Sequence, residues 1–261
     1  MSLDLDEYFR RIGYEGPREP TLDVLHALTM AHAQAIPFEN LDVLLGRPIR
    51  LELDAIFDKL VRQRRGGYCF EQNGLLLHVL TQLGFRATSL SARVRLQRPR
   101  DVTPARTHLF VRVELDGDSW LTDVGVGALS LTSAIRLALD VRQQTAHEPR
   151  RIVREGGLFF HQAFFADGWH DVNEFTLEAM PQIDREVANW YTSTHPSSIF
   201  RSAAMVARAA PNGVRITLLG RELSIRQRDG QSDKRTLDEA DVLPALAQHF
   251  GLYLPADARL P

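Results

Sequence analysis

The chain contains a single cysteine, Cys69, at a position where a thiol could act as a nucleophile. Cys69 follows Arg65-Gly66-Gly67-Tyr68 and precedes an apolar run at 75–83 that predicts a helix. The unpaired N–H groups and the positive dipole end at a helix N-terminus favour a thiolate over a thiol. Because the thiolate is the nucleophilic form, this position predicts covalent catalysis by Cys69.

A cysteine nucleophile also needs a base and a group that holds this base in one tautomer. Of the nine histidines, His108 begins a predicted strand at 108–115, and Asp123 ends the next predicted strand at 120–124. Asp116-Gly117 between them is typical of a hairpin turn. A two-residue turn makes His108 and Asp123 diagonal neighbours on one face, with Cβ atoms roughly 7 Å apart. A four-residue turn also keeps them on one face, whereas a three-residue turn separates them.

Each of these residues also has an ordinary structural explanation. A lone cysteine is more often a small buried apolar side chain, and a strand histidine is usually structural or exposed. Asp123, which precedes Val124-Gly125-Val126-Gly127, could simply shape a turn. On physical grounds alone, the catalytic and structural interpretations of the three residues are about equally supported.

Other possible sites are weaker. Gly125-Val126-Gly127 lacks the third glycine and the following helix of a dinucleotide-binding loop. One cysteine excludes a thiolate-rich zinc site, and we expect no metal. Arg65 is expected to be buried and paired, with Glu39 as its candidate partner.

The hydrophobic periodicity predicts helices first, then strands, then a mixed segment. Helices are expected near 5–12, 21–36, 54–61 and 69–83, and strands near 86–96, 108–115, 120–124, 151–154, 158–165 and 169–175. A loop is expected at 189–201, a hairpin at 214–219 and 222–226, and a closing helix at 241–250. This order predicts an α+β protein with a small antiparallel barrel or sandwich. The expected units are 1–85 with the nucleophile, 86–190 with the histidine and aspartate, and 191–261.

Composition limits the function classes. The 261 residues are 44% hydrophobic and 25% charged, with a formal net charge of -2, as in an ordinary globular protein. This charge gives no support for nucleic-acid binding, and no apolar run is long enough to span a membrane. The acidic N-terminus lacks the features of a signal peptide, and a single cysteine suits a reducing compartment. We therefore expect a cytoplasmic protein, either a monomer or a homodimer.

Four segments together carry a resemblance to a known family. They are Ile36-Pro37-Phe38-Glu39-Asn40-Leu41, the segment 65–74 around Cys69, Thr107-His108, and Asp123-Val124-Gly125-Val126-Gly127. In these segments the chain resembles the prokaryotic arylamine N-acetyltransferases, most closely over 1–130. The resemblance implies a helical bundle, an antiparallel β-barrel, a C-terminal α/β lid and a cysteine-protease-like catalytic core.

The resemblance also implies an activity, which is ping-pong transfer of acetyl from acetyl-CoA through an acetyl-cysteine. The acceptor would be an arylamine, hydrazine or arylhydroxylamine, as in xenobiotic metabolism. Cys69, His108 and Asp123 would form the catalytic triad. The acceptor pocket would be lined by Phe38, Phe70, Val126 and Phe200, and CoA would be contacted at Thr107, Gly125 and Gly127. Many relatives have phenylalanine at the position of Val126, so a wider pocket is expected here.

Three other functions remain open from the residues. A thiol hydrolase would use the same Cys-His-Asp chemistry but release the acyl group to water. An amide synthase would act within a large biosynthetic intermediate without CoA. A non-enzymatic binding module would simply bury Cys69, and its thiol would have ordinary reactivity.

Overall fold

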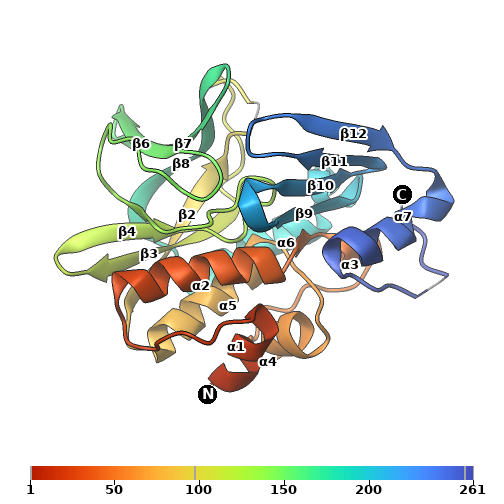
Figure 1. The fold of residues 1–261 in the computed structure, drawn as a ribbon, viewed down its shortest axis with the longest axis horizontal. Coiled ribbons are helices and arrows are strands. Elements are labelled where there is room, and N and C mark those ends of the chain that lie inside the picture. Colours follow the sequence, from red (N-terminus) through yellow and green to blue (C-terminus); the bar gives the residue numbers. More distant parts are fainter. Residues whose placement is uncertain (1, 97, 256, 261) are drawn as a thin grey trace.

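Helices from the first third of the chain lie together along one side of the molecule (Figure 1). The computed structural model describes residues 2–96, 98–255 and 257–260. The helices are α1 (Leu5–Ile12), α2 (Leu22–Ala35), the short α3 (Leu41–Leu44), α4 (Leu53–Phe57), which continues as a π-helical turn at Asp58–Arg62, and α5 (Cys69–Gln82). The Thr21 side chain caps α2 by accepting a hydrogen bond from the N–H of Val24, as its sequence position predicts.

Helix α5 lies between the other helices and the neighbouring sheet, and nearly all of its residues are buried. Leu75, Leu76, Val79 and Leu80 belong to one apolar core shared with α1 and α2. The same core includes Val111 and Val113 of the sheet. Because α5 is packed on both sides, its N-terminal residue has a fixed position relative to the sheet.

The middle of the chain forms a nearly closed antiparallel barrel. Its strands are β2 (Arg86–Val94), β3 (His108–Leu115), β4 (Asp118–Thr122), β5 (Ile135–Arg136), β6 (Arg150–Glu155), β7 (Leu158–Phe165) and β8 (Gly168–Ala179). They pair in the order β5-β4-β3-β2-β8-β7-β6. The segment after β5 bridges to β6, where Leu139 pairs with Ile152 and Gln143 with Arg150. These bridges bring the two edges of the sheet together.

The turn between β3 and β4 has two residues. Leu115 pairs with Asp118 and Val111 with Thr122, so Asp116-Gly117 alone forms the turn. Both turn residues have positive φ, 53° and 84°, the left-handed conformation that asparagine, aspartate and glycine tolerate in such hairpins. Of the three turn lengths considered from the sequence, the structure therefore has the two-residue turn.

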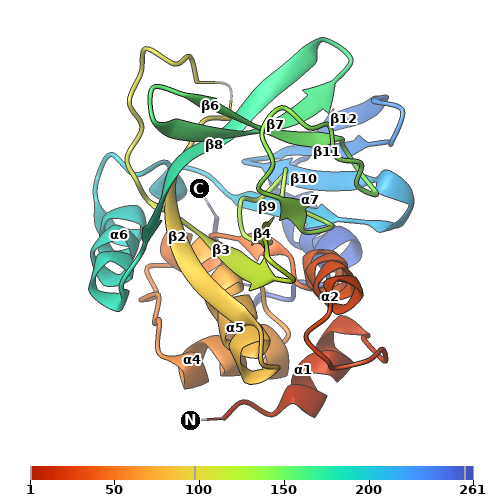
Figure 2. The same ribbon diagram turned by 90° about the vertical axis from the view of Figure 1, so that its left-hand side faces the viewer.

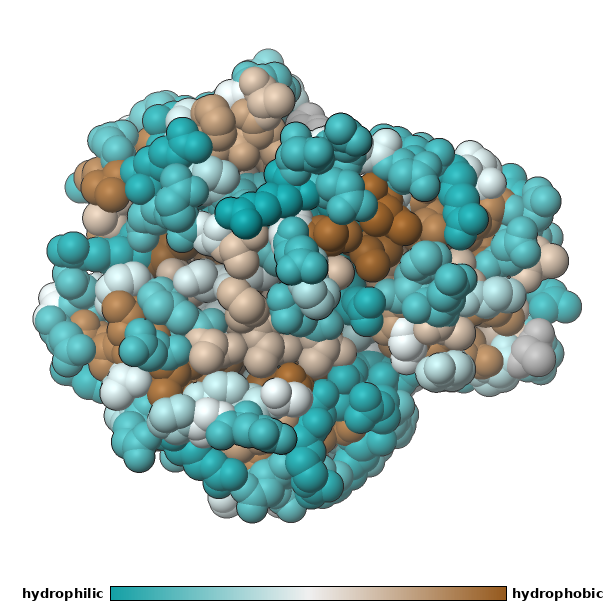
Figure 3. All heavy atoms as spheres, viewed as in Figure 1, coloured by the Kyte–Doolittle hydropathy of each residue, from teal (hydrophilic) through white to brown (hydrophobic). Residues whose placement is uncertain are grey.

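A second sheet lies beside the barrel (Figure 1, Figure 2). It consists of β1 (Phe38–Glu39), β9 (Met205–Ala209), β10 (Arg215–Leu219), β11 (Glu222–Arg226) and β12 (Ser232–Thr236), paired in this order. Helix α7 (Glu239–Ala245) and the following turn at Leu246–Phe250 pack against it. On the face viewed in Figure 3, most residues are hydrophilic, with a hydrophobic patch over this sheet.

The α+β organisation is thus as expected, but two details differ. The loop expected at 189–201 is wrong in its first part, because α6 (Gln182–Thr194) is helical and the short 3₁₀ turn at Ile199–Arg201 follows it. Position 190, the expected unit boundary, lies inside α6. Strand β1, from the helical part, pairs with β9 of the C-terminal sheet. Within the described residues, no helix is long and apolar enough to cross a membrane.

Candidate active site

Cys69 is the first residue of α5, as the sequence predicts. Tyr68 precedes the helix, and its N–H donates to the Glu71 carboxylate at 3.0 Å. The Glu71 N–H donates in return to the Tyr68 carbonyl oxygen at 3.0 Å, and the two bonds close the first helical turn. The Cys69 side chain is buried, and its Sγ lies 3.6 Å from the carbonyl oxygen of Thr107. The thiol therefore lies at the positive end of a helix, beside the strand that carries His108.

The two glycines before Tyr68 allow the chain to cross β1 at very short range. A Cβ atom at Gly66 would lie 2.1 Å from the carbonyl oxygen of Pro37. The N–H of Glu39 donates to the carbonyl oxygen of Gly67 at 3.0 Å, so the segment is held to β1. A side chain at Gly66 would push the nucleophile out of position.

Buried ion pairs hold Arg65, the residue before the two glycines, in place. Arg65 donates to Glu39 at 2.7 Å and to Asp42 at 3.2 Å, which confirms the predicted pairing with Glu39. Lys59 contacts both Asp42, at 2.8 Å, and Glu71, at 2.6 Å. The network thus reaches the carboxylate that caps α5.

His108 and Asp123 form the imidazole–carboxylate pair that the hairpin predicts. His108 Nε2 lies 2.7 Å from Asp123 Oδ2, and both side chains are buried. Burial alone would lower the pKa of His108, but the charge and hydrogen bond of Asp123, together with Cys69, raise it to about 10. Burial would likewise raise the pKa of Asp123, but His108 and other donors lower it. Each group of the pair thus favours the charged form of the other.

Asn73 connects the nucleophile helix to this pair. It lies one helical turn after Cys69, and its Nδ2 donates to Asp123 Oδ1 at 2.9 Å and to the carbonyl oxygen of Leu109 at 2.7 Å. Its Oδ1 accepts from the N–H of Val124 at 2.9 Å. The Asn73 amide thus contacts Leu109, the Asp123 carboxylate and Val124 in the loop after β4.

Gly125 allows this loop to pack directly on Cys69. A Cβ atom at Gly125 would lie 2.7 Å from the Cys69 Cα and 2.7 Å from Asn73 Nδ2. The Gly125 N–H also donates to Asp123 Oδ1 at 3.1 Å. The structure therefore shows that Gly125 is needed for close packing against Cys69. The sequence prediction gave Gly125 only a contact with CoA.

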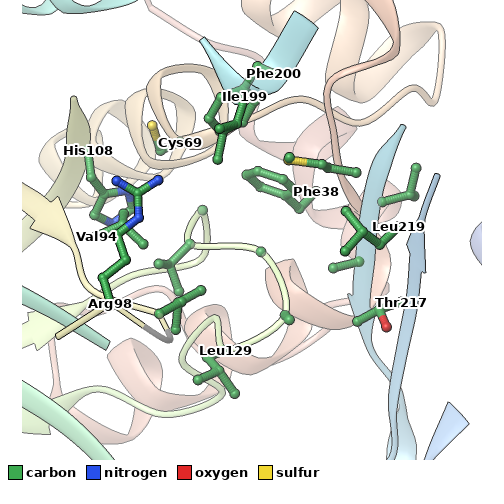
Figure 4. A pocket seen from close by; sticks show the side chains of 18 of the residues that line it. Phe38, Cys69, Val94, Arg98, His108, Leu129, Ile199, Phe200, Thr217 and Leu219 are labelled. Atoms are coloured by element: carbon green, nitrogen blue, oxygen red, sulfur yellow. The ribbon is translucent and has the colours of Figure 1, made fainter. Parts of the chain in front are cut away.

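A cavity of about 810 Å³ opens beside Cys69 and His108 (Figure 4). Phe38, Val126 and Phe200 line it, with Thr107, Gly125 and Gly127, as the sequence predicts. The Phe38 and Phe200 rings are tilted by 57° to each other, with centroids 6.2 Å apart. Phe70 does not line this cavity, contrary to expectation. Its ring is buried in the core and packs edge-to-face on Tyr68.

Cationic residues from the loop before β3 and from the second sheet also line the cavity. They are Arg98, Arg215, Arg226 and Lys234. Glu148, near the start of β6, accepts from Arg215 at 2.7 Å and from Arg150 at 2.9 Å, and it also pairs with Arg226. This cluster joins the barrel to the second sheet across the cavity.

Sequence comparison agrees with this geometry. A family model described as N-acetyltransferase matches residues 21–259. The chain is 43% identical over 256 residues to an arylamine N-acetyltransferase from Mycobacterium tuberculosis, covering 97% of the chain and 90% of the relative. It is 39% identical to one from Escherichia coli, with the same coverage. The chain belongs to the arylamine N-acetyltransferases, a family of acyltransferases.

Solved structures of the family share the whole fold. The arylamine N-acetyltransferase of Mycobacterium marinum superimposes with a TM-score of 0.92 at 43% identity, covering 95% of this chain and 92% of that one. The same Mycobacterium marinum enzyme in complex with CoA gives a TM-score of 0.91, with the same identity and coverage. The predicted arrangement of helices, barrel and C-terminal sheet is thus confirmed.

Several site residues escaped prediction from sequence. Asn73 had one usable signal, since a residue four positions after Cys69 lies on the same helical face. The Glu148 cluster had no such signal, because its members are far apart in sequence and meet only in the folded chain.

In the part of the chain that the structure describes, no group of three or more His, Cys, Asp or Glu residues could hold a metal ion.

Proposed function

We propose that this chain transfers acetyl from acetyl-CoA to arylamines, hydrazines or arylhydroxylamines through an acetyl-Cys69 intermediate. The observation that carries the proposal is Cys69 at the start of α5, beside the buried His108–Asp123 pair. The Asp123 carboxylate is hydrogen-bonded to His108 Nε2, so Nδ1 is the ring nitrogen that remains available to Cys69. The triad is thus supplied by one helix and one hairpin.

In the first half-reaction, His108 holds the proton that comes from Cys69. The Cys69 sulfur attacks the thioester carbonyl carbon of acetyl-CoA, and a tetrahedral oxyanion forms. Backbone N–H groups at the start of α5, including that of Cys69, would stabilise this oxyanion. The C–S bond to CoA then breaks, and His108 protonates the leaving CoA thiolate.

In the second half-reaction, an amine replaces CoA. Aromatic amines are weak bases and are largely neutral near pH 7, so the nitrogen lone pair is free to attack acetyl-Cys69. His108 accepts the proton that the nitrogen loses, and the Cys69 sulfur leaves. Phe38 and Phe200 supply aromatic walls for the acceptor ring.

The cavity also suits the cosubstrate. Its cationic residues can meet the phosphates of CoA, while Thr107 and Gly127 line the part near Cys69. The Mycobacterium marinum relative is described in complex with CoA. The relative from Salmonella typhimurium is also named an N-hydroxyarylamine O-acetyltransferase, which supports arylhydroxylamines as acceptors.

Intact-protein mass spectrometry tests the proposal. Incubation with acetyl-CoA should add one acetyl mass to the wild-type chain and none to Cys69→Ser. Adding an arylamine should then remove this acetyl group and give an equal amount of the acetylated amine. A wild type that stays unmodified would contradict the proposal and favour an amide synthase that acts without CoA. Loss of the acetyl group to water alone would indicate a thiol hydrolase.

A further inference from the structure

The side chain of Gln72 is fully buried beside the segment that leads into Cys69. Gln72 lies less than one helical turn after Cys69 on α5. Its Nε2 donates to the carbonyl oxygens of Pro37, at 2.7 Å, and of Ile36 and Gly67, each at 3.3 Å. These carbonyls belong to the two stretches of chain that cross just before the nucleophile. The Gln72 amide thus joins both stretches to the first turn of α5.

The crossing of the two stretches is close and has few other hydrogen-bond donors. A Cβ atom at Gly66 would lie 2.1 Å from the Pro37 carbonyl oxygen, and the Gly67 N–H reaches that oxygen only at 3.4 Å. A buried carbonyl without a good partner destabilises a fold, so the Gln72 amide stabilises the crossing. Because Gly67 is only two residues before Cys69, a shift of the crossing would also move the nucleophile.

A buried histidine holds the Gln72 amide in one orientation. Gln72 Oε1 lies 2.6 Å from His32 Nε2, and His32 Nδ1 lies 2.9 Å from the Tyr8 hydroxyl. Burial lowers the pKa of His32 to about 4, so its ring is neutral near pH 7 and carries one N–H. The carbonyl acceptors require the NH₂ group of Gln72 on their side, so Oε1 faces His32 and the ring proton must be on Nε2. Tyr8 then donates to Nδ1.

The hydrogen bonds therefore run in one direction, from Tyr8 on α1 through His32 on α2 to Gln72 on α5. All three side chains are fully buried, and each of their side-chain polar atoms has a partner. A fully satisfied buried network of this kind specifies one arrangement of the groups it joins. A side chain that merely filled the space of Gln72 would leave Pro37 and Gly67 free to shift.

We propose that Gln72 is a positioning residue that holds Cys69 beside His108. It acts through the carbonyl oxygens of Pro37 and Gly67, and it is not among the residues that line the cavity. This inference rests on the proposed function, because it names a residue on which the rate of Cys69 acetylation depends.

Gln82 offers a matched control on the same helix. Its Oε1 accepts from the Leu3 N–H at 2.8 Å, and its Nε2 donates to the Leu3 carbonyl oxygen at 2.9 Å. Gln82 is the last residue of α5, roughly 20 Å along the helix from Cys69. Gln82→Met therefore removes a comparable pair of hydrogen bonds without disturbing the nucleophile.

The test measures a single round of Cys69 acetylation by acetyl-CoA, at a temperature where urea unfolding shows each variant to be fully folded. Gln72→Met should lower the maximum rate on the order of 10²-fold, the cost of misplacing a reacting atom by about 1 Å. The acetyl-CoA concentration at half-maximal rate should not change, and Gln82→Met should alter neither quantity. Equal maximum rates for the two variants, or a loss only in the half-maximal concentration, would overturn the inference.

Gln72→Glu distinguishes the loss of a donor from a change of shape. The carbonyl oxygens around position 72 disfavour a carboxylate, so the introduced carboxyl is held protonated and can donate one hydrogen bond to Pro37. Its maximum rate should lie between those of Gln72→Met and wild type. A rate no higher than that of Gln72→Met would show that the donated hydrogen bond is not what positions Cys69.

Hydrogen exchange followed by mass spectrometry separates this inference from the proposed function, because it needs no acetyl-CoA. The segment 65–70 should exchange faster in Gln72→Met than in wild type, and Gln82→Met should leave this segment unchanged. Unchanged exchange in Gln72→Met would reject the role of Gln72 and leave the proposed acetyl transfer intact. Faster exchange in a protein that acetyl-CoA fails to acetylate would support the hold of Gln72 on this segment and reject the transfer alone.

Discussion

At the scale of single residues, the raised pKa of His108 is the central electrostatic feature. Burial disfavours the imidazolium, yet the charge of Asp123 and its hydrogen bond at 2.7 Å outweigh this penalty and raise the pKa of His108. Asp123 in turn is held by donors from His108, Asn73 and Gly125.

We expect Asp123→Asn to preserve the fold but to reduce kcat on the order of 10⁴-fold, the effect found when a triad histidine loses its orienting carboxylate. The amide keeps the shape but not the charge that holds the His108 proton. Steady-state acetylation of an arylamine measures the loss, and urea unfolding checks the fold. Asp118→Asn, on β4 of the same hairpin and paired with Arg136, is the control. Turnover of Asp123→Asn near that of the control would reject the role of Asp123.

At the scale of elements, the site depends on how closely α5 approaches the loop after β4. The loop crosses the first turn of α5 at a distance that only glycine permits at position 125. Asn73 then joins α5 to β3 and to the loop after β4 by hydrogen bonds. Cys69, His108 and Asp123 are thus fixed relative to one another by backbone packing.

Gly125→Ala should therefore impair both stability and activity. Its Cβ would lie 2.7 Å from the Cys69 Cα, so the loop or the helix must move, at a cost of about 1–3 kcal/mol. Urea unfolding and the rate of Cys69 acetylation measure the two effects. Gly74→Ala, on α5 itself, is the matched control, since its Cβ would meet only Ile56 at 3.6 Å and alanine favours helix. If both variants behaved alike, close approach would not be the function of Gly125.

At the scale of the whole molecule, the Glu148 cluster joins the barrel to the second sheet. Glu148 precedes β6, while Arg215 and Arg226 belong to β10 and β11. Arg150 also donates to the carbonyl oxygen of Leu129 at 3.0 Å, in the loop that lines the cavity. One carboxylate therefore influences both the contact between the sheets and the shape of the cavity.

Glu148→Gln should destabilise the protein by about 3–5 kcal/mol at pH 7, because buried guanidinium groups lose their counter-charge. Burial would raise the pKa of Glu148, but Arg215 and Arg150 hold it far below its ordinary value. Its contribution to stability is thus present above pH 4.5 and is lost as the pH falls below that value. The free energy of unfolding of Glu148→Gln should therefore fall less steeply with decreasing pH than that of the wild type.

Urea unfolding across pH 3–7 measures both effects. Glu155→Gln is the control, because Glu155 is exposed and pairs with Arg100 at the surface, where a pair contributes less than about 1 kcal/mol. Equal stabilities of the two variants at pH 7 would contradict the structural role assigned to Glu148.

The sequence by itself determined the local features of this protein. The glycines and the apolar run around Cys69 specify a helix start, and Asp116-Gly117 specifies a hairpin turn, because these preferences depend on backbone conformation within a few residues. Two of the three turn lengths considered place His108 and Asp123 on a common face, and the structure has the two-residue turn. The resemblance of four short segments was also sufficient to indicate the family.

Only the tertiary structure decided which distant residues meet. The Phe70 ring was expected in the cavity but packs in the core, since helix periodicity does not say which neighbour a buried face contacts. The Glu148 cluster depends on where the second sheet comes to lie against the barrel. Charge pairing and cavity shape are properties of long-range packing, and no local pattern in the chain encodes them.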